Sequence, residues 1–179
     1  MVAPSSSPFV IQKREGKIKN GATRVVLIGT GNTCTMRHVI DVEASTVEDP
    51  ALMAVVTRAK EEGIGVIISR HILAEPWHPR LAIDAYRMCN RVGGNICKIA
   101  LHPDSFNDVC TFFGCLPTLA LRGSDVEIAP MIIGDKFGKV SRLLLAVGGA
   151  PLIYGYLSKA CVAGQWKVSE IRPMLRKMK

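Results

Sequence analysis

Nearly continuous apolar runs, separated by amphipathic stretches, are the feature that most limits what this chain can fold into. Residues 64–71 and 96–101 form two such runs, and glycine, proline or polar residues bound each of them. Runs of this length are typical of strands in a parallel sheet that is covered on both faces. Residues 48–63 and 79–92 have the apolar spacing of helices. This alternation predicts a parallel α/β fold with right-handed crossovers.

The remaining segments extend the same pattern over the whole chain. Units of about 30 residues suit a (β/α) barrel of the TIM type, but eight units typically need about 250 residues. The chain has 179 residues. It therefore has room for about six units, and we predict a TIM-type barrel truncated to about six β/α units. We expect one domain over residues 8–179, after a flexible leader over residues 1–7. Further strands are predicted at 8–11, 24–31, 38–44, 126–134 and 151–156, and further helices at 105–114, 139–147 and 169–178.

A barrel with too few units leaves the edges of its sheet unpaired. In this chain the expected edges lie near Pro8 and Leu152. Exposed strand edges pair readily with other chains. We therefore expect a homo-oligomer, or a chain that needs a neighbouring domain.

Composition and charge exclude several classes of protein. The chain is 48% hydrophobic and 21% charged, which indicates a globular protein. No apolar run reaches the roughly 18 residues of a membrane span, and the first residues lack the basic and apolar regions of a secretory signal. The net charge is +8. The basic residues are scattered, except for a group on the last predicted helix without interleaved aromatic residues, so we expect no nucleic-acid partner.

The six cysteines do not form a metal-binding pattern. None are spaced as C-x-x-C and no paired histidines lie nearby, so we expect no zinc site and no other metal. Such cysteines are most simply reduced thiols, which predicts a cytoplasmic protein.

Lys98 is out of place in its predicted strand. Apolar residues flank it on both sides, from Asn95 to Leu101. Burying an ammonium is costly unless it is paired or loses its proton, and a neutral amine can condense with a ketone. The alternative is that Lys98 lies at the end of the strand and its side chain reaches water.

Polar residues at the ends of several predicted strands favour a functional role for Lys98. In a parallel barrel the chemistry gathers where strands end on their carboxyl side. His71 ends the strand before Lys98, while Arg142, Gln165 and Glu15 follow other strands. A lone histidine is more often structural, but a histidine and a lysine at matching ends of adjacent strands form a more specific pattern. We expect these five residues to meet at one mouth of the barrel.

Five segments, taken together in order and spacing, resemble type I 3-dehydroquinate dehydratase of the shikimate pathway. The resemblance runs from about Pro8 to Met178 and is strongest from Asp41 onward. The segments are Ile40-Asp41-Val42-Glu43, Ile67-Ile68-Ser69-Arg70-His71, Lys98-Ile99-Ala100-Leu101, Gly138-Lys139-Val140-Ser141-Arg142 and Lys159-Ala160-Cys161-Val162-Ala163-Gly164-Gln165.

The resemblance implies a lyase that removes water through a covalent imine, without a metal or diffusible cofactor. Lys98 matches the lysine that forms the Schiff base, and His71 matches the general acid and base. Glu15 resembles the acid that orients this histidine. Arg142 matches a residue that binds the substrate carboxylate, and Gln165 matches one that binds ring hydroxyls or the carboxylate. The implied ligand is a small anionic cyclic hydroxy acid, 3-dehydroquinate or a quinate-like molecule.

The chain also departs from the family pattern. The first two β/α units are missing, Lys13 stands where an arginine is expected, and Cys161 replaces a serine before the glutamine. The resemblance implies a helix over residues 24–36, although these residues have local β propensity.

Two function classes follow. One is a dehydratase with a small barrel. The other is a weak or inactive homologue that binds quinate or dehydroquinate in a regulatory role, as in fungal quinate repressors. A third and weaker interpretation is a truncated product whose core does not close. Retention of His71, Lys98, Arg142 and Gln165 favours the first two, with the enzyme ahead.

Overall fold

The computed structural model describes most of the chain from residue 39 onward and two short strands before it. The expected leader, Lys13 and Glu15 lie outside the described residues. For β1 and β2 the backbone alone is described. The described ranges are 9–12, 23–28, 39–46, 49–120, 125–148 and 150–177.

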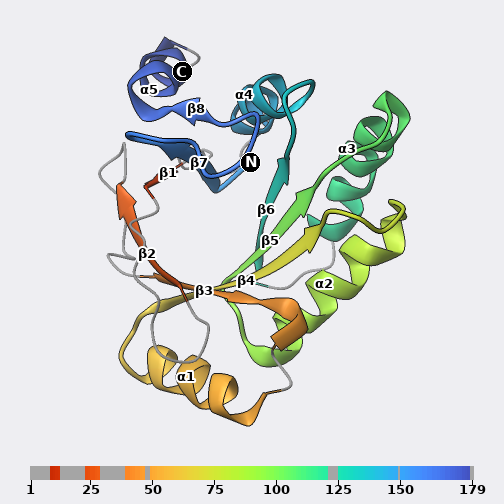
Figure 1. Cartoon of the computed structure of the whole chain (residues 1–179). Coiled ribbons are helices and arrows are strands. Elements are labelled where there is room, and N and C mark those ends of the chain that lie inside the picture. The colour runs from red at the N-terminus through yellow and green to blue at the C-terminus, as the bar shows by residue number, and fades with distance from the viewer. Residues whose placement is uncertain are drawn as a thin grey trace, which may run out of the picture.

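Strands and helices alternate through the described residues from β3 to β7, and β8 then precedes α5 (Figure 1). Helices α1, α2 and α3 lie along one outer side of the curved sheet, and α4 and α5 lie near β7 and β8 (Figure 1). The strands are β1 (Phe9–Gln12), β2 (Thr23–Ile28), β3 (Val39–Glu43), β4 (Gly65–Ile72), β5 (Ile96–Leu101), β6 (Glu127–Ile132), β7 (Leu152–Tyr156) and β8 (Trp166–Lys167). The helices are α1 (Pro50–Glu61), α2 (Pro79–Val92), α3 (Phe106–Ala120), α4 (Gly138–Val147) and α5 (Val168–Lys177), with a 3-10 turn η1 (Ala44–Thr46) after β3.

The ends of α1 and α2 follow from local sequence. Asp49 caps α1, because its Oδ1 accepts a hydrogen bond of 2.9 Å from the backbone N–H of Ala51. Proline occupies the first turn of both helices, where no backbone N–H is needed. Gly93 ends α2 with a φ of 73°, a left-handed conformation that glycine adopts without strain.

The strands form one eight-stranded sheet in the order β6-β5-β4-β3-β2-β1-β7-β8. Strands β3 to β6 run parallel, as do β1, β7 and β8. Strand β2 joins the two groups and is antiparallel to both β1 and β3. The class predicted from sequence, a truncated TIM-type parallel barrel, is confirmed.

The described residues contain five strand–helix pairs, from β3–α1 to β7–α5, close to the predicted number of about six. Strand β2 lies outside this series. The connections before and after β2, residues 13–22 and 29–38, are each shorter than the dozen or more residues that a parallel crossover needs. Short connections allow antiparallel pairing, which β2 adopts. Its strand conformation agrees with the local β propensity rather than with the helix that the resemblance implies.

The two faces of the sheet carry different cores, because successive side chains of a strand point to opposite faces. Cys97, Ile99 and Leu101 of β5 pack outward in the large cluster that includes residues of α1, α2 and α3. Ile96 and Ala100 lie in the inner cluster, where Leu152 and Tyr154 of β7 also lie. Lys98 has the same parity as this inner cluster, so its side chain belongs to the interior of the barrel.

The barrel has a seam between β6 and β7, which do not pair. The backbone N–H of Glu127 donates to Asn95 O (3.0 Å) and that of Ile133 donates to Leu101 O (2.8 Å), so alternate amides of β6 point to β5. Residue 130 therefore points to the seam, and it is a proline with no N–H to donate. Proline is found in sheets mainly on such edge strands.

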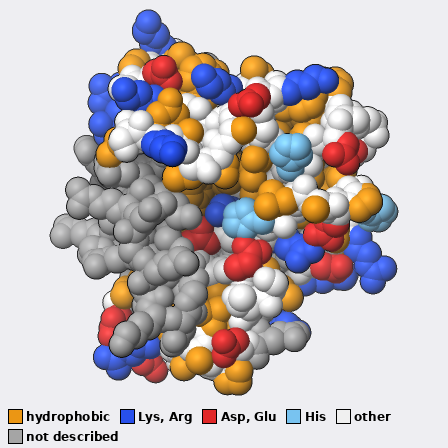
Figure 2. Space-filling model, viewed as in Figure 1, with side chains coloured by type: hydrophobic (Ala, Val, Ile, Leu, Met, Phe, Trp, Pro, Cys, Tyr) orange, Lys and Arg blue, Asp and Glu red, His pale blue; other side chains and the backbone are white. Residues whose placement is uncertain are grey.

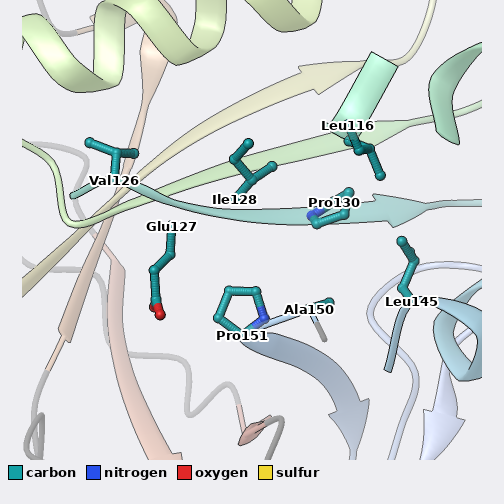
Figure 3. A pocket seen from close by; sticks show the side chains of 8 residues that line it. All are labelled: Leu116, Val126, Glu127, Ile128, Pro130, Leu145, Ala150 and Pro151. Carbon is teal, nitrogen blue, oxygen red and sulfur yellow. The ribbon is translucent and has the colours of Figure 1, made fainter. Parts of the chain in front are cut away.

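A cavity of about 320 Å³ lies along this seam (Figure 3). Its walls are apolar, apart from Glu127, and burial raises the pKa of the Glu127 carboxyl. The cavity is lined by Leu116, Val126, Glu127, Ile128, Pro130, Leu145, Ala150 and Pro151.

The seam corrects the prediction about sheet edges. The sequence predicted unpaired edges near Pro8 and Leu152, but β1 and β7 pair with each other, with Phe9 opposite Leu152. The edge strands of the described sheet are β6 and β8. The prediction was wrong because it placed the sheet edges near the two ends of the sequence. One edge strand, β6, instead comes from the interior of the sequence.

None of the helices in the described ranges has the length and apolar character that crossing a membrane requires.

Hydrogen exchange along β6 should alternate from residue to residue. The amides of Ala129 and Met131 face β5 and should be protected, while the amide of Ile128 faces the seam and should exchange faster. NMR-detected exchange checks this, with the central strand β5, which is paired on both sides, as the internal control. Equal protection at Ile128 would contradict an open β6 edge.

Candidate active site

Polar side chains gather on the inner face of three neighbouring parallel strands. The register aligns Glu43 of β3 with Ser69 of β4, and Ser69 with Lys98 of β5. Asp41 and His71 lie two residues from Glu43 and Ser69, and therefore on the same face. Figure 2 shows a hollow in the molecule where basic, acidic and histidine side chains meet among hydrophobic ones. The candidate site consists of Asp41, Glu43, Ser69, His71 and Lys98.

Lys98 is buried and paired. Only 6% of the residue is exposed, so the alternative that its side chain reaches water is wrong. Its Nζ lies 3.0 Å from Oδ2 of Asp41 and 4.9 Å from the centre of the Tyr154 ring. The carboxylate and the ring face both stabilise a cation at this place.

Asp41 is in turn held by its neighbours. The hydroxyl of Ser69 donates to Oδ1, and the hydroxyl of Tyr154 lies 3.5 Å from Oδ2. Burial raises the pKa of Tyr154 well above its ordinary value, and the negative charge of Asp41 and the hydrogen bond to it act in the same direction. Tyr154 is therefore a neutral phenol beside the ion pair.

His71 forms a second pair, with Glu43. Its Nδ1 is hydrogen-bonded to Oε2 of Glu43, and its backbone N–H donates to Oε1 at 3.4 Å. Both side chains are 34% exposed. A carboxylate at Nδ1 fixes the proton on that nitrogen and leaves Nε2 free to accept one.

Glu43 makes the contact that was expected of Glu15. Glu15 lies outside the described residues, so its own role stays a prediction. The signal for Glu43 was present in the sequence, because Asp41 and Glu43 are acids two residues apart in an apolar strand. The sequence could not tell which partner each acid would meet, since that depends on strand register. Ser69 and Tyr154 were missed for the same reason.

Among the residues that the structure describes, Arg142 is the most deeply buried charged residue, at 2% exposure. Its Nη1 donates to Gly138 O at 2.7 Å and also to Gly164 O, so it ties the loop after β7 to the start of α4. Its Nε and Nη2 are buried without a hydrogen-bond partner. Burial lowers the pKa of Arg142 to about 10. Two unpaired donors on a buried cation are costly, and a bound carboxylate would satisfy them.

Of the other residues expected to bind substrate, the structure describes Gln165 and Cys161. Gln165 accepts a 2.9 Å hydrogen bond from the backbone N–H of Cys161, which closes the loop that Arg142 holds through Gly164. Arg142 and Tyr154 also line one narrow internal void. Lys13 lies outside the described residues.

Among the residues that the structure describes, no three or more His, Cys, Asp or Glu side chains are grouped so that they could hold a metal ion.

Tyr154 should make stability depend on alkaline pH. Because its folded-state pKa is raised, it contributes stability that is fully present below the ordinary tyrosine value of about 10 and is lost as pH rises through the raised value. The free energy of unfolding should therefore fall with pH above about 10, and Tyr154→Phe should reduce this fall. Denaturant unfolding on both sides of this pH measures the slope. Tyr156→Phe, on the same strand, is the comparison variant, and equal slopes in the two variants would contradict the assignment.

Comparison with known proteins gives a consistent result. The profile of the family described as type I 3-dehydroquinase matches residues 12–179. The 3-dehydroquinate dehydratase of Clostridium kluyveri is 31% identical over 152 residues, which cover 84% of this chain and 57% of that protein. The enzyme of the same name from Staphylococcus carnosus is 26% identical over 137 residues, covering 76% and 56%.

Solved structures agree with the sequence relatives. The crystal structure of the 3-dehydroquinate dehydratase from Aquifex aeolicus VF5 superposes with a TM-score of 0.63 at 31% identity, covering 76% of this chain and 58% of that one. The structure from Geobacillus kaustophilus HTA426 has a TM-score of 0.68 at 20% identity, covering 78% and 53%, and supports the fold alone. The chain thus spans somewhat more than half the length of the relatives it matches. Its sequence profile, the identity to its relatives and its barrel place the chain in the type I 3-dehydroquinase family.

Proposed function

We propose that the chain dehydrates 3-dehydroquinate to 3-dehydroshikimate, as a carbon–oxygen lyase of shikimate or quinate metabolism that uses no diffusible cofactor. The observation that carries the proposal is the placement of buried Lys98 and the His71–Glu43 pair on one face of three neighbouring strands. Membership of the type I 3-dehydroquinase family supports it.

Lys98 supplies the covalent step. Its neutral amine adds to the ketone carbon of the substrate, and loss of water gives an imine. The imine withdraws electrons, so the adjacent C–H becomes acidic enough for a histidine to take its proton near neutral pH. A buried position for Lys98 suits this step because it keeps water from competing for the imine.

His71 moves the protons at carbon. Its Nε2 takes the proton next to the imine, and the resulting enamine expels the β-hydroxyl, which leaves as water with the proton from His71. Glu43 at Nδ1 holds the ring in the tautomer that this step needs and stabilises the imidazolium. Hydrolysis of the product imine restores Lys98.

Arg142 binds the substrate carboxylate through Nε and Nη2, the two donors without a partner. These two groups have the parallel geometry that a carboxylate accepts. Gln165 and Cys161, in the loop that Arg142 holds, contact ring hydroxyls of a cyclic hydroxy acid. Lys13 and Glu15 remain candidates from sequence for the same pocket.

The net charge, the cysteines and the edge of β6 support proposals about the substrate, the location and the partners of the protein. The net charge of +8 favours encounter with an anionic substrate. The described cysteines are free thiols, which supports the proposal of a cytoplasmic protein. The open edge of β6 favours association with a second copy or a neighbouring domain.

Borohydride reduction should freeze the imine on Lys98. With 3-dehydroquinate or 3-dehydroshikimate present, we expect a mass increase on Lys98, and the yield should rise with pH because only the neutral amine adds to a ketone. His71→Ala should keep the adduct and lose about 10²–10⁴-fold in turnover, because proton removal at carbon stalls. Peptide mass spectrometry and absorbance of dehydroshikimate measure the two effects.

The matched variants for this experiment are Lys98→Ala, which should lose adduct and turnover, and Lys167→Ala, an exposed lysine that should keep both. If the wild-type protein binds quinate but never forms an adduct at any pH, the covalent mechanism is wrong. The chain would then act as a quinate-binding regulatory module.

Arg142→Lys should weaken binding of quinate or 3-dehydroquinate. Lysine keeps the charge but cannot offer two parallel donors, so the loss should be about 1.5–3 kcal/mol of binding free energy. Isothermal titration calorimetry measures the affinity. Arg80→Lys, at an exposed salt bridge on α2, is the control and should bind as the wild type does. Unchanged affinity in Arg142→Lys, with normal thermal unfolding, would rule out Arg142 as the carboxylate site.

A further inference from the structure

Asp41 is a partly buried carboxylate that the steps at carbon do not use. It lies between three polar groups, from Ser69, Lys98 and Tyr154, on three different strands. The Asp41 side chain is 12% exposed and that of Lys98 is 8% exposed. We call Asp41, Ser69, Lys98 and Tyr154 the Asp41 cluster. A carboxylate with this little exposure, fixed by three neighbours, has one defined orientation.

The orientation directs one oxygen of Asp41 to the amine. Ser69 occupies Oδ1, so Oδ2 is left to face Nζ of Lys98 at 3.0 Å. Glu43, the other acid on this strand face, is occupied by His71. Within the described residues, Asp41 is the carboxylate that Lys98 contacts directly.

Imine formation needs a proton carrier at this nitrogen. Lys98 must lose a proton before it can attack a ketone, and the hydroxyl of the resulting carbinolamine must gain one before it can leave as water. Bulk water has poor access to the Lys98 side chain, which is only 8% exposed. Proton transfer within a hydrogen bond that already exists avoids this barrier.

We propose that Asp41 carries the proton of imine formation at Lys98, an inference that rests on the proposed function. Oδ2 takes a proton from the Lys98 ammonium, and the neutral amine adds to the ketone carbon. A proton shift within the adduct gives the carbinolamine, and Asp41 returns its proton to the hydroxyl, which leaves as water. The nitrogen keeps one hydrogen and becomes the iminium, so the charge of the pair is the same before and after. Asp41 performs the reverse transfers when the product imine is hydrolysed.

The two carboxylate pairs thus divide the proton transfers. Asp41 serves the nitrogen of Lys98, while Glu43 acts through His71 on the carbon next to it. Tyr154 is a positioning residue in this scheme. Its ring face lies 4.9 Å from Nζ and its neutral hydroxyl lies 3.5 Å from Oδ2, so it can hold both partners without competing for the proton.

The division predicts that imine formation and turnover can be separated by mutation. Rapid mixing with 3-dehydroquinate, followed by borohydride quenching at set times, gives the rate of adduct formation on Lys98. Asp41→Asn keeps the shape of the side chain but cannot carry a proton, so this rate should fall about 10²–10⁴-fold. His71→Ala should form the adduct at the wild-type rate. Quinate, which has no ketone, should bind Asp41→Asn by calorimetry with about the wild-type affinity.

A second variant covers the case in which Asp41→Asn does not fold. Ser69→Ala leaves the Lys98–Asp41 pair in place and removes only the hydrogen bond to Oδ1. It should slow adduct formation several-fold, by less than Asp41→Asn, with unchanged quinate affinity. Asp41→Ala with added sodium formate is a further readout, because a small carboxylate that enters the vacated space should restore part of the rate, while sodium chloride should not.

The outcomes are distinct. An adduct that forms at the wild-type rate in Asp41→Asn, or in Ser69→Ala where Asp41→Asn does not fold, overturns the role of Asp41 and leaves the proposed function standing. An adduct that is absent from the wild-type protein overturns the proposed function and this inference together. A slow adduct in Asp41→Asn, with a normal rate in His71→Ala and normal quinate binding, supports both.

Discussion

The ion pair between Lys98 and Asp41 is the interaction on which the rest of the site depends. A buried ammonium is tolerated only with a partner at close distance, and the carboxylate needs further donors of its own. The order and register of three parallel strands bring these partners together. The pairing of β3 with β4 and of β4 with β5 aligns Glu43, Ser69 and Lys98 in one row, and Asp41 reaches across from the same strand face. A slip of one residue in either pairing would move these side chains to the outer core, where they would have no partner.

Arg142 stands in contrast to Lys98, because its hydrogen bonds are incomplete. Nη1 holds two carbonyl groups, those of Gly138 and Gly164, while Nε and Nη2 remain buried and unpaired. The two glycines permit this closeness, since a Cβ at Gly138 would lie 2.9 Å from the Cα of Gly164. Nη1 of the guanidinium thus fixes the loops, while Nε and Nη2 are left as two buried donors without a partner. In the proposed mechanism, the paired cation Lys98 performs the covalent chemistry and the half-paired cation Arg142 binds the substrate.

The sequence indicated candidate residues of the site better than their contacts. Strand ends can be located from apolar runs and their polar boundaries, so His71, Lys98 and Arg142 were singled out as candidates, and parity put Asp41 and Glu43 on one face. Which acid meets which base depends on register, and periodicity carries no information about register between strands. The same limit explains the N-terminal half. The apolar runs at β1 and β2 look like any other strand, and only the length of the connections around β2 indicates that it runs antiparallel.

The altered strands at the N-terminus are compatible with an intact site because of where they lie in the sheet. Asp41, Ser69 and Lys98 occupy consecutive parallel strands, and this ladder does not include β1 or β2. Tyr154 is the exception, since β7 reaches β3 through β1 and β2. These two strands therefore act as the spacer that sets β7, and with it the Tyr154 ring, across the barrel from Lys98. At the seam, β6 and β7 do not pair, and Pro130 removes a hydrogen-bond donor from β6. The geometry around the amine therefore depends on the register of β3, β4 and β5 for Asp41, and on the spacer for Tyr154.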